Sequence, residues 1–460
     1  MSSSASPSPS PADERPLVRS TYAVWELTLR CNLKCIHCGS RAGAARCDEL
    51  STAEALDLVH QMADLGIREV SLIGGEAFLR RDWLEIAREI TRSGMVCGMT
   101  TGGYGLGPKM AEQIAEAGLE KVSVSIDGLE ATHDFLRGRQ GSYTQCFVAL
   151  RALRAAGIQI ATNTQINRLS APELPRLQEI LRDAGVRMWQ TQLTVPMGNA
   201  ADHAEILLQP WELLDLFPLL SYLLQRGIEE GPRMMPGNNI GFFGPYERMM
   251  RTHPNDAEAK FWQGCAGGVL TLGIEADGAI KPDPSLPTAA YTGGNIRERP
   301  LRDIVYGAEQ LTFNDDRGTE HLWGFCEGCE FADICRGGDT WTAHVFFDRR
   351  GNNPFCHHRS LYHAASGQRE RLELAVAAEG VPFDNGVFDI ALEPCDAPLP
   401  NNGFSLADVD WPEPWLEADP ELPPRLAAER DRAVEVWRQT RLRRPPEGAA
   451  ATASRLDTAG

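Results

Sequence analysis

Three cysteines with short spacing offer the clearest chemistry in the sequence. Cys31, Cys35 and Cys38 lie within CNLKCIHC, directly after an apolar run. A 4Fe–4S cluster normally takes four thiolates, so three of them suit a cubane that keeps one iron open to bind and activate a small molecule. The alternative is a structural zinc loop, and Cys47 lies close enough in the sequence to be a fourth ligand that would make the site merely structural.

Further along the chain, apolar runs alternate with helical patterns as far as residue 195. Ser51 lies three residues before Glu54, which is a capping-box spacing and marks the start of the first helix. Each candidate helix ends on a glycine placed like a C′ cap, at Gly66, Gly94, Gly118, Gly157 and Gly185. The runs between the helices indicate six strands, AVWELTLR, REVSLIGG, VCGMTT, KVSVSID, IQIATNTQI and RMWQTQLTV.

Several of these runs are apolar almost throughout, as in parallel strands that are buried on both faces. Six β/α units in series predict an α/β fold, either a parallel barrel or a doubly wound sheet. In both architectures the chemistry lies at the carboxyl ends of the strands. The cysteine loop follows the first strand, a GGE segment follows the second, and an SxD segment closes the fourth.

The rest of the chain has a different character. Residues 211–227 indicate an apolar helix that Pro218 bends or interrupts. The Gly/Pro/Asn-rich stretch 231–245 predicts a loop and a domain boundary. Residues 260–360 carry most of the remaining cysteines in a turn-rich context, which favours a small lobe organised by metal.

These patterns resemble the radical S-adenosylmethionine (SAM) enzymes, whose signature is CxxxCxxC. The resemblance implies a partial (β/α)6 TIM-like barrel, a 4Fe–4S cluster on Cys31, Cys35 and Cys38, and SAM chelated by the open iron. Reduction of the cluster then releases a 5′-deoxyadenosyl radical that abstracts hydrogen from a substrate, with electrons from a reductase such as flavodoxin or ferredoxin. Residues at matching strand ends are implied to hold the cofactor, namely Gly74, Gly75, Glu76, Ser125, Asp127, Arg137 and Asn163.

Within this resemblance, Glu76 is expected to pair with the cofactor's ammonium, and Arg137 with its carboxylate. The sequence departs from the family at two places. His37 precedes the last cysteine where an aromatic residue is common, and Thr101 occupies a position where relatives often have asparagine. No cofactor role is therefore carried over to Thr101.

The second cysteine group resembles the SPASM domain, an auxiliary-cluster extension of many peptide-modifying radical enzymes. Cys326, Cys329, Cys335 and Cys356 match the complete set that holds the outer cluster, so the resemblance implies at least one auxiliary 4Fe–4S cluster. A zinc ribbon is the alternative from spacing alone.

At the inner auxiliary cluster, only Cys265 matches. Asp283 and Asp339 stand at two positions where the family has cysteine. We expect this cluster to be absent or unusual. In its absence, a carboxylate of Asp283 or Asp339 is a candidate catalytic group that takes the proton released when a substrate radical is oxidised, although a solvated turn aspartate explains either residue as well.

Composition predicts a disordered Ser/Pro leader and a Pro/acid-rich C-terminal extension, and the resemblance predicts the radical SAM core and the SPASM-like domain between them. The order along the chain is leader, core, SPASM-like domain and extension. Their ranges are 1–20, 21–235, 255–365 and 366–460. Trp411, Trp415 and Trp437 in the extension either cover the catalytic lobe, bind a partner or belong to a poorly ordered tail.

Composition and charge narrow the range of possible binding partners. The formal net charge of −18 argues against nucleic acid, and no apolar run is long enough to span a membrane. The chain begins without a secretory signal, which predicts a cytoplasmic protein whose clustered cysteines bind metal. Cys97 and Cys146 are expected in the core, and Cys395 has no evident partner.

The family resemblance implies an enzyme that modifies a ribosomally made peptide or protein by a crosslink, an oxidation or an epimerisation. Three alternatives stay open at this point. They are a sulfatase-type formylglycine maturase, an enzyme of tetrapyrrole or quinone cofactor biosynthesis, and a non-catalytic iron–sulfur or zinc scaffold.

Overall fold

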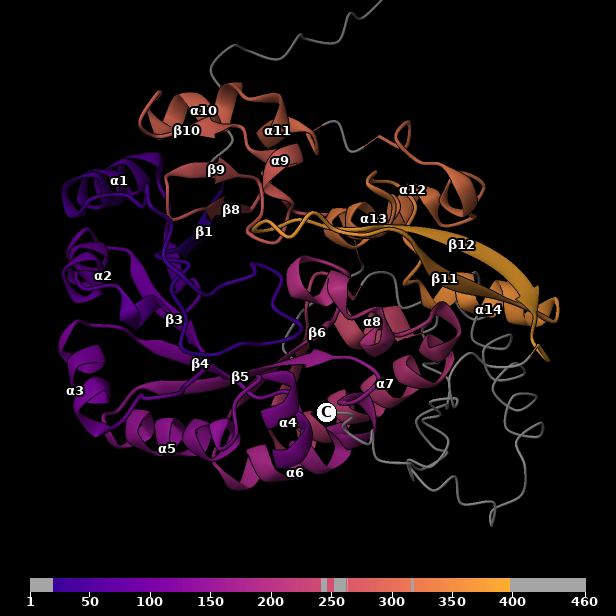
Figure 1. Cartoon of the computed structure of the whole chain (residues 1–460), viewed down its shortest axis with the longest axis horizontal. Helices are drawn as coiled ribbons and strands as arrows, with labels where there is room; N and C mark the ends of the chain where they lie inside the picture. Colours follow the sequence, from indigo (N-terminus) through magenta and orange to yellow (C-terminus); the bar gives the residue numbers. More distant parts are fainter. Residues whose placement is uncertain (1–19, 241–245, 252–261, 263, 316–317, 398–460) are drawn as a thin grey trace, which may run out of the picture.

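The computed structural model in Figure 1 describes residues 20–240, 246–251, 262, 264–315 and 318–397. The leader up to residue 19 and the three tryptophans of the extension lie outside the described residues.

Seven parallel strands, paired in chain order, form the centre of the molecule. The six predicted strands are confirmed, and a seventh forms within the stretch expected to be loop. Their bounds are β1 Tyr22–Glu26, β2 Glu69–Ile73, β3 Val96–Thr101, β4 Lys121–Ser125, β5 Gln159–Ile166, β6 Met188–Leu193 and β7 Arg233–Pro236. The fold is therefore an α/β partial barrel, as predicted.

Helices that connect these strands cover the outer face of the curved sheet (Figure 1). They are α1 Thr52–Leu65, α2 Trp83–Arg92, α3 Pro108–Glu116, α4 Glu130–Leu136, α5 Ser142–Ala155, α6 Leu174–Asp183 and α7 Leu213–Glu230. The Ser51–Glu54 capping box is present at α1. All five predicted end glycines are left-handed, with φ between 79° and 92°. Helix α7 continues through Pro218 without interruption.

The sheet does not stop at the predicted core. Strand β8 (Thr271–Ile274) pairs in parallel with β1, and β9 (Ala279–Lys281) and β10 (Gly294–Asn295) follow antiparallel, giving a ten-stranded sheet. Part of the cysteine-rich region therefore extends the barrel sheet, while the domain boundaries given above stay a prediction. The helices of this region are α8 Glu247–Arg251, α9 Thr288–Tyr291, α10 Leu301–Gly307, α11 Glu309–Thr312, α12 Ala332–Cys335, α13 Thr340–Phe347 and α14 His357–Ala365.

Short 3₁₀ turns complete the connections. They are Ala77–Leu79, Ala171–Glu173, Gly198–Asp202, Ala204–Ile206, Pro210–Glu212 and Gly324–Cys326.

A hairpin that the sequence did not suggest follows α14. Strands β11 (Gln368–Val376) and β12 (Val387–Pro394) form a separate two-stranded sheet. The tip of the hairpin reaches the barrel, where the Gly198 amide donates to the Asp384 carbonyl at 2.8 Å. The described part of the C-terminal extension is thus folded against the catalytic core.

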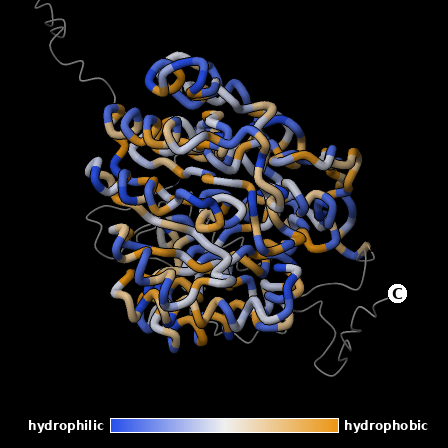
Figure 2. Tube along the Cα trace, turned by 60° about the vertical axis from the view of Figure 1, so that its left-hand side comes forward, coloured by the Kyte–Doolittle hydropathy of each residue, from blue (hydrophilic) through white to orange (hydrophobic). Residues whose placement is uncertain are grey.

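Apolar and polar residues are interspersed along the coloured part of the trace in Figure 2, as expected when each element buries one side. Cys97 in β3 and Cys146 in α5 are fully buried, which confirms their predicted core positions. Among the described residues, no helix is both long and apolar enough to cross a membrane.

Candidate functional site

The loop after β1 carries the three clustered cysteines, and backbone hydrogen bonds hold it at two places. The Cys31 amide donates to the Gly43 carbonyl at 3.0 Å, which closes the loop on itself. The Ile36 amide donates to Leu136 at the end of α4 at 2.9 Å. Cys31, Cys35 and Cys38 all line one cavity of about 230 Å³, which we call the cluster cavity. Cys47 is exposed and does not line it, so the structure gives no support for a fourth thiolate there.

Each of the three sulfurs has an N–H group directed at it. Leu33 N and Ala42 N lie 3.4 Å from the sulfurs of Cys31 and Cys38, and Arg137 Nη1 lies 3.8 Å from that of Cys35. Burial raises the pKa of Cys35 to about 12; Arg137 acts to lower it and the other two thiols raise it further. A bound cationic centre, such as an iron–sulfur cluster, would stabilise the thiolate form of Cys35.

Among the described residues, no three Cys, His, Asp or Glu side chains converge as ligands of a single metal ion would.

Two glycines bring the second strand against the cysteine loop. A Cβ on Gly74 would lie 2.3 Å from the Thr28 carbonyl oxygen, and one on Gly75 would lie 2.4 Å from that of Arg30. Only glycine permits this approach, which places the Glu76 amide within 2.8 Å of the Arg30 carbonyl. The GGE segment thus aligns the glutamate with the cysteines.

Glu76 is buried at the wall of the cluster cavity, and only one of its two carboxylate oxygens has a hydrogen-bond partner among the described residues. Its Oε2 accepts a hydrogen bond from the Gly102 amide at 2.9 Å, while Oε1 has no partner among the described residues. Burial raises the pKa of Glu76 to about 7, although hydrogen bonds from Thr101 and Gly102 act to lower it. The unpaired oxygen suits an ammonium group in the cavity.

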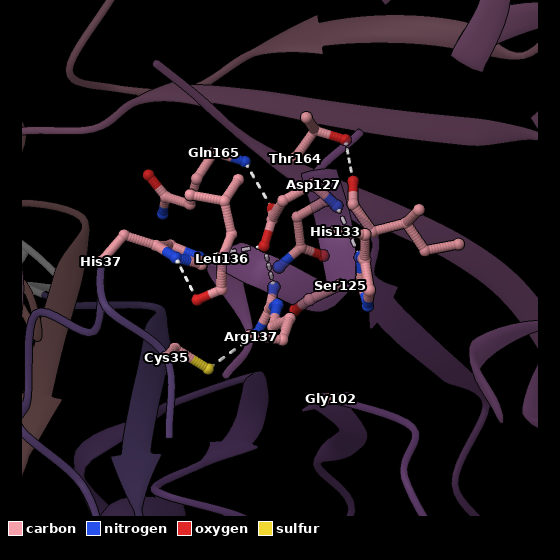
Figure 3. Close-up of polar contacts among 12 residues, drawn as sticks. Cys35, His37, Gly102, Ser125, Asp127, His133, Leu136, Arg137, Thr164 and Gln165 are labelled. Atoms are coloured by element: carbon pink, nitrogen blue, oxygen red, sulfur yellow. Dashed lines mark hydrogen bonds and ion pairs between the residues drawn. The ribbon is translucent and has the colours of Figure 1, made fainter. Parts of the chain in front are cut away.

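Asp127 also lines the cluster cavity, and Figure 3 shows its polar contacts. Its Oδ1 accepts from the Gln165 amide at 2.8 Å, and its Oδ2 lies 2.9 Å from His37 Nε2 and 2.5 Å from Arg137 Nη2. Although burial opposes this, Arg137 and His37 hold the pKa of Asp127 well below its usual range. Both oxygens are therefore occupied in orienting Arg137 and His37, and a direct contact of Asp127 with a cofactor stays a prediction.

His37, the variant position of the signature, is built into this network. Its Nδ1 lies 3.2 Å from the Leu136 carbonyl, so both ring nitrogens face oxygen atoms. Arg137, by contrast, keeps a buried Nε with no partner among the described residues. An unpaired donor on Arg137 and an unpaired acceptor on Glu76 line one cavity, which fits the carboxylate and ammonium of a methionyl group.

The remaining predicted cofactor residues also reach this cavity. Ser125 lines it from the end of β4 and Asn163 from within β5, and the Asn163 side chain accepts a hydrogen bond from Ser123. Thr101 and Gln165 line it as well and were not assigned from the sequence. The MTT ending of β3 was the available signal for Thr101, whose hydroxyl reaches Glu76.

A second cavity of about 330 Å³, which we call the barrel cavity, shares walls with the first. Residues that line both are His37, Gly39, Ile73, Gly74, Thr100, Asn163 and Gln165. Amide side chains of β5 and β6 face it from one side, and Glu26 and Asp283 are its carboxylates. Its lining, taken over the described residues, contains no Arg or Lys.

Cys265 and the two altered inner-cluster positions, Asp283 and Asp339, are brought together beside this cavity. Burial raises the pKa of the Cys265 thiol to about 12, with Asp339 and Asp283 as the next contributions. Asp339 caps α13, where its carboxylate accepts from the Thr342 amide at 3.2 Å. Burial, followed by Asp283, raises the pKa of Asp339 to about 7. Asp339 is therefore buried, whereas Asp283 is partly exposed and its Oδ1 accepts from the Ser285 amide at 3.0 Å, as in a turn.

The outer set of four cysteines also lies together. Burial raises the pKa of Cys335, and Cys356, Cys326 and Cys329 each raise it further. Phe331 packs among this group, and its amide points at the Cys329 sulfur at 3.4 Å. Cys395 lies elsewhere, where its thiol donates to the Gln368 carbonyl at 3.1 Å.

Similar proteins agree with this geometry. The radical SAM superfamily model matches residues 25–167. The chain is 30% identical to the AdoMet-dependent heme synthase of Methanosarcina barkeri, over 73% of this chain and 95% of that protein. It is 26% identical to the PqqA peptide cyclase of Rhizobium meliloti, over 78% of this chain and 90% of that protein.

Solved structures share the fold. Streptococcus suis SuiB bound to S-adenosylmethionine has a TM-score of 0.56 at 15% identity, covering 70% of this chain and 74% of that one. The anSMEcpe enzyme with bound AdoMet and the Kp18Cys peptide has a TM-score of 0.58 at 14% identity, covering 74% and 95%. The cavity residues, the matched family model and a relative aligned over nearly its whole length establish that this chain is an enzyme of the radical SAM superfamily, whose members use S-adenosylmethionine and a 4Fe–4S cluster.

Proposed function

We propose that this enzyme modifies a peptide substrate held in the barrel cavity. When bound, SAM and the reduced 4Fe–4S cluster supply a 5′-deoxyadenosyl radical that abstracts a substrate hydrogen atom. Cys31, Cys35 and Cys38 hold the cluster. Glu76 Oε1 would accept from the methionyl ammonium and Arg137 would receive the carboxylate, and the wall that the two cavities share supports a substrate bound next to the cofactor.

The observation that carries the choice of substrate is the charge of the barrel cavity. Two carboxylates and several amides line it, with no Arg or Lys among the described residues. A tetrapyrrole substrate carries propionate groups, which such a lining would repel unless they pointed out of it. A neutral or cationic peptide segment is compatible with it. The likeness to a PqqA peptide cyclase, and to SuiB and anSMEcpe structures solved with peptides, supports the same choice.

Tetrapyrrole chemistry is the second candidate, because a specific observation favours it. Heme-forming relatives align over most of their length, among them the heme synthase above and a pre-heme d1 synthase of Dinoroseobacter shibae that is 28% identical. We place it second because the cavity chemistry opposes it.

For the auxiliary region we propose one 4Fe–4S cluster on Cys326, Cys329, Cys335 and Cys356. We further propose that Cys265, Asp283 and Asp339 hold no cluster, and that one of the two aspartates takes the proton when a substrate radical is oxidised. A cluster on the four outer cysteines would supply an acceptor for the electron, so the proton and the electron would leave by separate groups. An external reductase such as flavodoxin or ferredoxin remains the predicted electron donor to the radical cluster.

The test is an anaerobic assay of 5′-deoxyadenosine on reconstituted, reduced enzyme, with Cys35→Ala as the control. Synthetic peptide pools and Fe-coproporphyrin III are added separately. Stimulation by peptides that disappears in Cys35→Ala supports the proposal. Stimulation by the porphyrin alone would replace it with the second candidate.

A further inference from the structure

Strand β1 supplies one wall of the barrel cavity. Its alternate residues Tyr22, Val24 and Glu26 all line the cavity, because side chains two apart on a strand share a face. Glu26 is the last residue of β1 and lies opposite Ile73 in the register with β2, directly before the GGE segment. It therefore lies at the end of the cavity that adjoins the cofactor residues.

Only one of the two carboxylate oxygens of Glu26 has a hydrogen-bond partner among the described residues. Oε1 lies 3.3 Å from both Arg46 Nε and the Ala276 amide. Oε2 has no partner among the described residues, although the side chain is only 2% exposed. Burial raises the pKa of Glu26 to about 7, with Arg46 acting to lower it and Glu275 to raise it. A buried carboxylate oxygen without a partner is costly, and a ligand donor would offset that cost.

The two nearby cations, Arg46 and Lys281, do not donate a hydrogen bond to Glu26 Oε2. Arg46 also pairs with Glu275 at 2.9 Å, and Lys281 pairs with Glu275 at 2.8 Å. Neither Arg46 nor Lys281 lines the cavity, whereas the second carboxylate, Asp283, does. The cavity therefore presents two acids, with the balancing cations outside its lining.

We infer that Glu26 is a substrate-recognition residue, whose Oε2 binds a positively charged side chain of the peptide, Lys or Arg, in the barrel cavity. The inference rests on the proposed peptide substrate. A cation that enters the barrel cavity gains a buried counter-ion. A substrate carboxylate would instead lie beside the carboxylates of Glu26 and Asp283 and would find no Arg or Lys in the described lining to pair with. Glu26 would thus select which peptide residue enters beside the cofactor.

The experiment uses three synthetic peptide pools of equal length whose central residue is perdeuterated lysine, norleucine or glutamate. Reconstituted, reduced enzyme is supplied with SAM, and deuterium in 5′-deoxyadenosine reports hydrogen abstraction from the central residue. We expect the lysine pool to exceed the glutamate pool by about tenfold or more, since hydrogen bonds to charged groups have effects of this size. Glu26→Gln should remove most of that preference, and Glu26→Asp should retain part of it.

Glu275→Gln is the matched control, because Glu275 is buried in the same charge network but does not line the cavity. It should keep the lysine preference. Deuterium transfer without a charge preference, or a preference that survives Glu26→Gln, would overturn the inference while leaving the peptide proposal intact. No transfer from any pool, with stimulation by Fe-coproporphyrin III, would overturn the proposed function itself and the inference with it.

Discussion

Glu76 and Glu26 each have one carboxylate oxygen that a ligand could occupy. Glu76 uses one oxygen on Gly102 and Glu26 uses one on Arg46, while the second oxygen of each has no partner among the described residues. Both lie at the carboxyl ends of neighbouring strands. The first belongs to a recognisable segment, whereas the second is an ordinary strand residue in the sequence.

Glu76→Gln tests the assignment at residue scale. The variant keeps the shape of the side chain but removes the charge that pairs with the ammonium, so SAM affinity should fall about 10- to 100-fold. Equilibrium dialysis with labelled SAM on reconstituted protein measures this. Glu85→Gln, an exposed substitution on α2, is the control and should bind normally. Unchanged affinity in Glu76→Gln would contradict the proposed role.

Among the elements, α4 and α5 are joined by one carboxylate. Asp134 on α4 accepts from the Gly141 amide at 2.6 Å, and from the Ser142 hydroxyl and the Tyr143 amide at 2.8 Å. This junction supports Arg137 at the end of α4, so its order affects the cluster cavity.

Asp134→Asn should reduce the free energy of unfolding by about 1–3 kcal/mol near neutral pH. Burial acts to raise the pKa of Asp134, but hydrogen bonds from Tyr143, Gly141 and Ser142 lower it overall from its usual 3.8. A lowered pKa stabilises the fold above the unfolded-state value, and this contribution is lost as the pH falls. The difference between wild type and variant should therefore shrink below about pH 4 in denaturant titrations. A difference that grows on acidification would contradict the assignment.

The hairpin β11–β12 is a second element with a specific attachment. Asp384 at its tip accepts from Arg41 Nε in the cysteine loop at 2.6 Å and from the Gly380 amide at 2.6 Å. Phe383 beside it lines the barrel cavity. The hairpin therefore covers the cavity through contacts with the cluster loop.

Asp384→Ala should release this tip. Hydrogen exchange in residues 377–386 should become faster, because the amides of Gly380 and Val381 lose their acceptor. Exchange of α1, which lies away from the hairpin, is the internal reference (Figure 1). Unchanged exchange at the tip would show that other contacts hold it.

For the whole molecule, the prediction concerns metal content. One radical cluster and one outer auxiliary cluster give about eight iron atoms per chain after reconstitution. Cys335→Ser should lower this to about four, measured by elemental analysis with sulfide counting, and should leave SAM binding in place. Cys395→Ser is the control, since Cys395 lies outside the four-cysteine set. About twelve irons in the wild type would contradict a vacant inner site, and bound zinc would contradict the auxiliary cluster.

Much of this enzyme could be read from local sequence. The strand-and-helix alternation, the left-handed end glycines and the Ser51 cap each depend on a few neighbouring residues, and all are confirmed. The cysteine loop, GGE and SxD segments were found in the same way, because their function requires specific residue types at short spacing. Strand β7 and the hairpin were missed, since their pairing partners are distant or their apolar pattern is weak.

The sequence by itself determined the predicted cofactor site, because the residues expected to bind a cluster and SAM follow successive strands and must meet at one edge of a parallel sheet. Only the tertiary structure decided which oxygens and nitrogens there remain unpaired. It also decided that Asp283, Asp339 and Cys265 come together, and that Glu26 faces a cavity without Arg or Lys in its described lining. Burial and partner counts are set by contacts across the whole chain, and no local pattern records them.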